Sequence, residues 1–176
     1  TIGPVVVKSI KPLTKIFLDV HLMVEHPEDL IKPFADAGAD GITFHVEAAE
    51  EPGLVIDLIR STNKQIGISL KPQTPFSMIE PFLDQIDLLL IMSVEPGFGG
   101  QEYIPSSTRK IKDIHQRLIK FGLRDRILIE IDGGIKLTNA EEIAKAGAEI
   151  LVAGSEIFQS ENPVQTIQKF KALGVT

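Results

Sequence analysis

Strand-like and helix-like segments alternate along this chain, with short connections and no stretch that resembles a linker. Apolar or alternating runs predict strands at 16–23, 41–47, 65–70, 87–94, 126–132 and 149–153. Amphipathic segments predict helices at 4–11, 27–37, 53–60, 74–83, 106–120, 139–146 and 163–173. Strands that are each followed by a helix are typical of an α/β fold with a parallel sheet, predicted here as one domain over residues 1–176.

The two faces of the predicted strands differ in polarity. In strand 41–47, Phe44 and Val46 lie on an apolar face, whereas His45 and Glu47 lie on the opposite one. An open sheet covered by helices on both sides needs two apolar faces, but a closed barrel presents only its outside to helices. The pattern therefore favours a (β/α) barrel with polar residues at the carboxyl ends of its strands, although six units are two fewer than eight.

Composition argues against several classes of function. The 176 residues carry a formal net charge of −6 and no cluster of Lys or Arg, which disfavours nucleic acid and anionic membranes as main partners. The chain has no cysteine, which excludes disulfides and thiolate metal sites and fits a reducing cytoplasm. No apolar run approaches the ~20 residues of a membrane-spanning helix, and we recognise no signal-peptide pattern. We therefore expect a cytoplasmic protein.

The fourth predicted strand runs directly into a glycine-rich loop. Pro96 ends the strand, and Gly97, Gly99 and Gly100 allow the backbone to bend or to approach a ligand closely. Phe98 has no sheet beside it to pack on. Residue types alone are equally consistent with an ordinary turn and with a lid that closes over a substrate and excludes water.

Four segments of the chain together resemble the ribulose-phosphate 3-epimerase family. They are Asp19–Val24, Met92–Gln101, Glu130–Ile135 and Val152–Ser155, and they match the family in order through essentially the whole chain. The resemblance implies a (β/α)8 TIM barrel of the ribulose-phosphate-binding type. The six units would then be strands three to eight, and the first two strands would be absent from this sequence.

The family's activity is epimerisation at C3 of a ketose phosphate, D-ribulose 5-phosphate to D-xylulose 5-phosphate, in the pentose phosphate pathway. Two carboxylates remove and return the proton through an enediolate, and a divalent metal ion acts as a Lewis acid. The resemblance implies His21 and Asp132 as metal ligands and substrate contacts, with Asp132 also the proton donor. Both residues fall on the polar faces of their predicted strands, which agrees with this assignment. The family's second His, second Asp and catalytic base match no position of this sequence.

Imidazole and carboxylate ligands suit zinc, which we expect first, as well as iron, manganese or cobalt. The resemblance also implies substrate contacts from Gly97, Phe98, Gly99, Gly100, Gly133, Gly134, Gly154 and Ser155. The last four follow the final two strands, where barrels bind phosphate with backbone N–H groups and a helix N-terminus. Met23 and Met92 would form an apolar wall of the site, although Met92 is equally well explained as core.

Other functions remain open at this point. The same chemistry on a six-carbon substrate would make the protein an allulose-6-phosphate 3-epimerase. A catalytically incomplete fragment that only binds a phosphosugar is a second alternative. A decarboxylase of the same superfamily is disfavoured, because the Asp-x-Lys-x-x-Asp cluster expected there is absent. We expect a small phosphosugar as substrate and a homo-oligomer, since family members are commonly dimers or hexamers.

Overall fold

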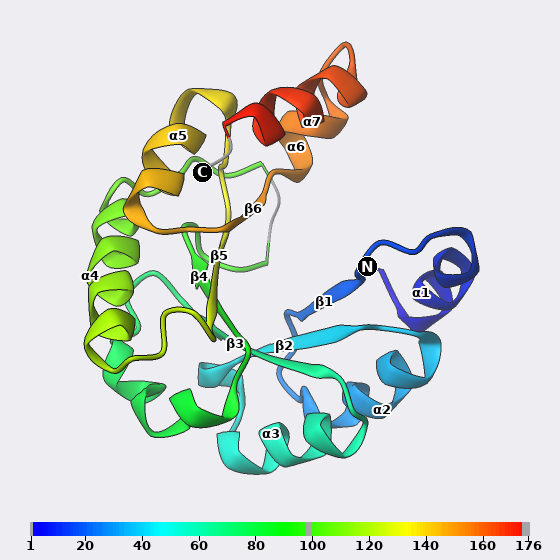
Figure 1. The fold of residues 1–176 in the computed structure, drawn as a ribbon. Helices are drawn as coiled ribbons and strands as arrows, with labels where there is room; N and C mark the ends of the chain where they lie inside the picture. The colour runs from blue at the N-terminus through cyan, green and yellow to red at the C-terminus, as the bar shows by residue number, and fades with distance from the viewer. Residues whose placement is uncertain (1, 98–99, 174–176) are drawn as a thin grey trace. The chain divides into compact units, whose positions relative to one another are not determined.

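The computed structural model describes residues 2–97 and 100–173 (Figure 1). Its strands are β1 (Asp19–Leu22), β2 (Gly41–His45), β3 (Gln65–Leu70), β4 (Leu88–Met92), β5 (Leu128–Asp132) and β6 (Ile150–Val152). The strand order is β1-β2-β3-β4-β5-β6, so each strand lies beside its neighbour in the chain. The pairs β1/β2, β2/β3 and β5/β6 are parallel. The α/β class and every predicted strand are confirmed, and most strands are shorter than predicted.

The α-helices are α1 (Pro4–Ile10), α2 (Glu28–Ala37), α3 (Pro52–Ser61), α4 (Ser106–Lys120), α5 (Leu137–Ala146), α6 (Gly154–Phe158) and α7 (Pro163–Ala172). Helices α2 and α5 both end at a glycine with positive φ, 104° at Gly38 and 120° at Gly147. Such a glycine accepts the conformation that closes a helix without the strain a Cβ would add. Among the described residues, no helix is long and apolar enough to cross a membrane.

Two features of the helices differ from the prediction. The predicted α-helix at 74–83 is wrong, because this region forms the short 3-10 helices η3 (Phe76–Met78) and η4 (Glu80–Gln85). Pro81 explains the break, since proline lacks an N–H and its ring clashes with the preceding turn of an α-helix. Helix α6 was not predicted, and its five residues are too few to show a helical period.

The chain divides into two compact units, and the first comprises Thr1–Leu70 and Pro75–Leu89. In this unit β2 pairs with β1 on one side and β3 on the other. Its core includes Ile42, Phe44 and Ile68, which have no exposed surface. Burying side chains of this size stabilises the fold by about 1.5–3 kcal/mol each. The 3-10 helix η2 (Val46–Ala48) follows β2 directly and carries Glu47.

The second unit comprises Lys71–Thr74 and Leu90–Thr176. Here β5 pairs with β6, and Asp132 lies opposite Val152. The Lys110 ammonium group on α4 donates to the carbonyl oxygens of Lys71 (2.6 Å), Pro72 (3.2 Å) and Thr74 (2.8 Å). These bonds hold the segment that follows β3 against α4. A single-domain organisation stays a prediction.

Candidate functional site

In the first unit, two histidines from neighbouring strands meet. His21 on β1 is half-buried, and His45 on β2 is 3% exposed. Their Nε2 atoms lie 2.9 Å apart, and the rings stack with centroids separated by 4.9 Å. A contact of this length between two imidazole nitrogens is a hydrogen bond with one donor and one acceptor. The ring of His21 is therefore held at one edge by His45.

A carboxylate lies behind this pair. Glu47 Oε2 in η2 lies 3.4 Å from Nδ1 of His45, and both side chains are largely buried. Sequence reasoning placed His45 and Glu47 on the polar face of their strand but gave neither a part in the chemistry, and it favoured an ion pair with Lys71 for Glu47 or Glu130. The period-two alternation was the available signal, whereas the approach of His45 to His21 depends on strand register and is invisible in either segment alone.

In the second unit, Asp132 ends β5 and is half-buried. Its main chain is fixed by Ser93, a residue with no exposed surface. The Ser93 N–H donates to the Asp132 carbonyl (2.9 Å), and the Ser93 hydroxyl lies 2.9 Å from that oxygen and 2.6 Å from the Gly133 carbonyl. The Asn139 side-chain amide donates to the Gly134 carbonyl (3.1 Å). Asp132 is thus positioned through its own main chain.

The glycines predicted to bind phosphate have different surroundings. Gly133 and Gly134 adopt positive φ angles of 119° and 64°. A Cβ at Gly133 would lie 2.5 Å from a methyl carbon of Val94, and one at Gly134 would overlap the backbone of Tyr103. Their neighbours therefore require glycine. At Gly154, by contrast, no described atom other than those of its chain neighbours and of the backbone of its own helix lies within 4 Å of a Cβ position.

The remaining predicted residues lie in varied settings. Met92 on β4 is 1% exposed and belongs to the core, whereas Met23 is 46% exposed. Ser155 in α6 is exposed. Gly97 and Gly100 are exposed with positive φ angles of 127° and 76°. Phe98 and Gly99, on which the lid prediction depends, lie outside the described residues.

Comparison with known proteins decides the family. A sequence model of the ribulose-phosphate 3 epimerase family matches residues 1–158. The chain belongs to this family. It is 41% identical to ribulose-phosphate 3-epimerase of Bacillus subtilis, over 97% of this chain and 78% of that protein. It is 46% identical to the Synechocystis protein of that name, over 95% of this chain and 73% of that protein. It is 42% identical to the chloroplastic ribulose-5-phosphate-3-epimerase of Arabidopsis thaliana, over 98% of this chain but only 61% of that protein.

Solved structures agree with this family at the level of fold. KGPDC from Streptococcus mutans superposes with a TM-score of 0.73 at 18% identity, over 96% of this chain and 77% of that one. Orotidine 5'-phosphate decarboxylase from Pyrococcus horikoshii gives a TM-score of 0.71 at 17% identity, over 98% of this chain and 81% of that one. Identities this low establish the fold alone, which is TIM-barrel-like α/β.

The donor atoms of the two predicted ligands fit a divalent metal ion of the kind expected in this epimerase family. An imidazole and a carboxylate together suit zinc, iron, manganese or cobalt. Metal-ligating histidines usually have their second ring nitrogen fixed by a hydrogen bond, and His45 provides such a bond to His21. His21 belongs to the first unit and Asp132 to the second. Within residues 2–97 and 100–173, no three His, Asp or Glu side chains form a group that could hold a metal ion.

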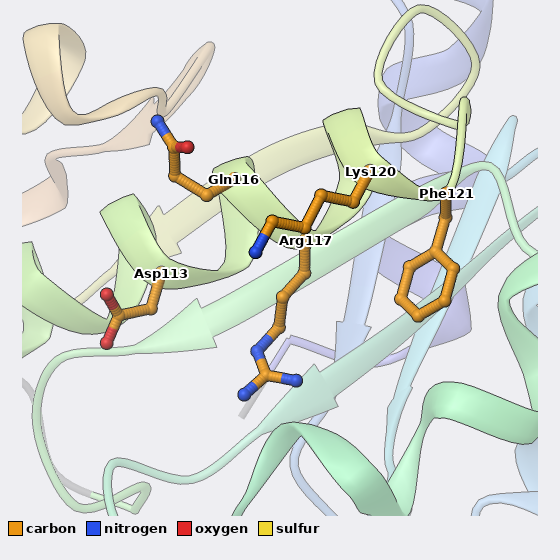
Figure 2. Close-up of a pocket in the computed structure, with 5 residues that line it drawn as sticks. All are labelled: Asp113, Gln116, Arg117, Lys120 and Phe121. Carbon is orange, nitrogen blue, oxygen red and sulfur yellow. The ribbon is translucent and has the colours of Figure 1, made fainter.

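Two surface hollows lie in the second unit, and no predicted site residue lines either of them. One, of about 510 Å³, lies along α4 and is bordered by side chains of that helix and of Phe121 directly after it, as Figure 2 shows: Asp113, Gln116, Arg117, Lys120 and Phe121. The other, of about 800 Å³, is lined by residues including His115, Arg124, Glu149 and Phe170.

The second hollow contains a partly buried charge network. The Arg124 guanidinium group donates to Nδ1 of His115 (2.9 Å) and to the Gly147 carbonyl (3.3 Å), and it pairs with the Glu149 carboxylate (2.8 Å). Burial and the Arg124 charge lower the pKa of His115 below its ordinary value of 6.5. His115 therefore accepts from Arg124 as a neutral ring, and this network joins α4 to the start of the β6 segment.

Proposed function

We propose that this protein catalyses the epimerisation of D-ribulose 5-phosphate to D-xylulose 5-phosphate with the aid of a divalent metal ion, as a step of the pentose phosphate pathway. The observation that carries the proposal is identity of 40–47% over at least 90% of the chain to proteins named ribulose-phosphate 3-epimerase. The resemblance of its motifs supports the same reaction. We propose that its six strands correspond to strands three to eight of a (β/α)8 barrel.

Asp132 is proposed as the proton donor and as a metal ligand. Its place at the carboxyl end of β5 is where barrels of this class position catalytic side chains. The bonds from Ser93 and Asn139 to the adjoining carbonyls keep the main chain from moving when the carboxylate gives up a proton. A positioned acid of this kind contributes about 10²–10⁴-fold to a rate.

His21 is proposed as a second metal ligand, with zinc as the first choice of metal. The bound ion would act as a Lewis acid, which stabilises negative charge that develops on the substrate oxygen. The hydrogen bond to His45 supports this role, because it engages Nε2 of His21 and restricts the ring to one orientation. We propose that Met23 and Met92 form an apolar wall of the site.

The phosphate group is proposed to bind at the loop and helix that follow β5 and β6. Gly133, Gly134, Gly154 and Ser155 are the residues assigned to it. The open space at Gly154 supports the assignment, since no described neighbour requires glycine there and a ligand would. The segment from Gly97 to Gly100 is proposed to close over the substrate. We also propose that the protein acts as a homo-oligomer.

The test is a coupled assay on two substrates, D-ribulose 5-phosphate and allulose 6-phosphate, after chelation and after return of Zn²⁺, Fe²⁺, Mn²⁺ or Co²⁺. We expect turnover of the five-carbon substrate to be lost on chelation and restored by metal. Equal or faster turnover of the six-carbon substrate would favour the hexulose-phosphate enzyme. Binding of either phosphosugar without turnover under every metal condition would favour a binding fragment instead.

A further inference from the structure

We infer that His45 is a positioning residue, which orients His21 through the hydrogen bond between their rings while the Glu47 carboxylate faces the other ring nitrogen of His45. The inference rests on the proposed role of His21 as a metal ligand and concerns residues of the first unit only. His45 contacts His21 and does not itself serve as a ligand in this account. Its role is to determine which nitrogen of His21 carries a proton.

The first step is the bond between the two rings. Because the Nε2 atoms lie 2.9 Å apart, one of them carries the hydrogen and the other offers a lone pair. A neutral imidazole has one protonated nitrogen, so the direction of this bond also determines the state of both Nδ1 atoms. Only two arrangements of the neutral pair exist.

The metal-binding role selects one of them. If His21 donates from Nε2, its Nδ1 carries the lone pair that a metal ion needs. If His45 donates instead, both lone-pair sites of His21 are lost, since Nε2 accepts the bond and Nδ1 is protonated. A metal-binding His21 therefore donates to His45, and His45 must carry its own hydrogen on Nδ1.

The surroundings of His45 independently favour that state. Its Nδ1 atom is buried and makes no hydrogen bond in the described part of the chain, while Glu47 Oε2 lies 3.4 Å away. An ionised carboxylate only accepts, so it favours a hydrogen on the nitrogen that faces it. Leaving a buried N–H without an acceptor costs about 1–3 kcal/mol, which a small shift of Glu47 toward His45 avoids.

The direct test is the protonation of individual ring nitrogens, read from long-range ¹H–¹⁵N spectra of ¹⁵N-histidine-labelled protein with and without Zn²⁺. We expect His45 to carry its hydrogen on Nδ1 in both samples, and His21 to carry its hydrogen on Nε2. With Zn²⁺ bound, the resonance of His21 Nδ1 should shift. A hydrogen on Nε2 of His45 in the zinc-loaded protein would overturn the inference.

Zinc affinity, measured by competition with a chromophoric chelator, provides a second readout that does not depend on turnover. His45→Phe keeps a ring of similar size without a polar atom, and Glu47→Leu removes the acceptor. Each should weaken zinc binding by about 10–100-fold, the usual effect of losing a group that orients a ligand. Glu47→Gln should retain most of the affinity, because its amide oxygen still accepts.

Ser69→Ala is the matched control. Ser69 lies opposite His45 across β2 and β3, it is fully buried, and its hydroxyl has no hydrogen bond among the described residues. We expect its zinc affinity to equal that of the wild type. Folded His45→Phe and Glu47→Leu proteins that bind zinc as tightly as this control would contradict the inference.

Failure of the inference differs from failure of the proposed function. A wild-type protein that binds no zinc, iron, manganese or cobalt overturns the metal-dependent function. The positions of the hydrogens on the two rings are then decided by the metal-free spectra alone, where a hydrogen on Nε2 of His45 would refute the inference. A wild-type protein that binds zinc but shows no effect of the His45 and Glu47 variants leaves the function intact and rejects the positioning role.

Discussion

The two units hold their candidate catalytic residues in different ways. In the first, His21 is fixed by another side chain, His45, behind which Glu47 lies. In the second, Asp132 is fixed by bonds to the carbonyl oxygens of its own loop, with Ser93 as the main partner. The first arrangement controls the state of a ring nitrogen, whereas the second controls the path of the backbone.

This difference predicts how each half responds to substitution. Substitutions at His45 or Glu47 should act mainly on metal affinity. The neighbouring strands are held together by main-chain pairing, which does not involve these side chains. Changes to the groups that bond to the carbonyl oxygens of the Asp132 loop should lower the free energy of unfolding as well as the catalytic rate. The same bonds hold the loop in its folded conformation and position Asp132.

The largest effect is expected for Asp132→Asn, which removes a ligand and a proton donor at nearly constant shape. We expect kcat for D-ribulose 5-phosphate to fall by about 10²–10⁴-fold or more, with the melting temperature nearly unchanged. Asp113→Asn on the exposed surface of α4 is the control and should retain full turnover. Wild-type turnover in Asp132→Asn would remove this residue from the mechanism.

Gly134→Ala should have the largest effect on stability. The residue has a φ of 64°, and a Cβ there would lie 2.8 Å from the Tyr103 Cα atom. We expect a loss of about 2 kcal/mol or more of unfolding free energy in urea titrations, from strain and displaced backbone.

Gly154→Ala is the matched variant, because no neighbour opposes its Cβ. It should unfold like the wild type but show a raised KM for the phosphorylated substrate. A stable Gly134→Ala protein would remove the contrast between these two glycines.

Ser93→Ala should have an intermediate effect. It leaves the carbonyl oxygens of Asp132 and Gly133 without the hydroxyl, although the Ser93 N–H bond remains. Loss of a buried hydrogen bond of this kind costs about 1–3 kcal/mol. We expect this loss in unfolding free energy together with a lower kcat, because Asp132 is positioned by the same bonds. A reduced stability with unchanged kcat would show that the loop tolerates movement during the reaction.

The smallest effect concerns the dependence of stability on pH. Burial and Arg124 lower the pKa of His115, so at and just below pH 6.5 the unfolded chain binds more protons than the folded one. The stability that His115 contributes is therefore present above that pH and is lost as the pH falls through about 6.5 toward the lower folded pKa. His115→Gln should show a flatter dependence in urea unfolding between about pH 7.5 and 5.5. An identical slope in both proteins would exclude His115 as the source.

Local patterns predicted most of the secondary structure. The predicted strand at 65–70 and the predicted helix at 106–120 have the same bounds as β3 and α4 in the structure. Alternation is strong in the first segment and amphipathic periodicity in the second. The segment 74–83 failed because its apolar spacing resembles a helix while Pro81 prevents one. The spacing of apolar residues predicts a helix here unless the effect of the proline on the backbone is considered first.

The candidate site was predictable only in part. His21 and Asp132 follow from strand ends and from the resemblance to the family. The bond between His21 and His45 joins segments 24 residues apart in the sequence, and the bond from the Ser93 hydroxyl to the Asp132 carbonyl joins segments 39 residues apart. Such contacts depend on register and packing, which a pattern within one segment does not contain.

We propose that two different groups take and return the proton at C3, and that Asp132 is one of them. It is tested most directly by running the reaction in heavy water and measuring deuterium at C3 of the xylulose 5-phosphate formed, by NMR or mass spectrometry. We expect deuterium at C3 in nearly every product molecule made by the wild type, because the returning proton comes from a group that exchanges with solvent. Product that keeps its original hydrogen at C3 would contradict it.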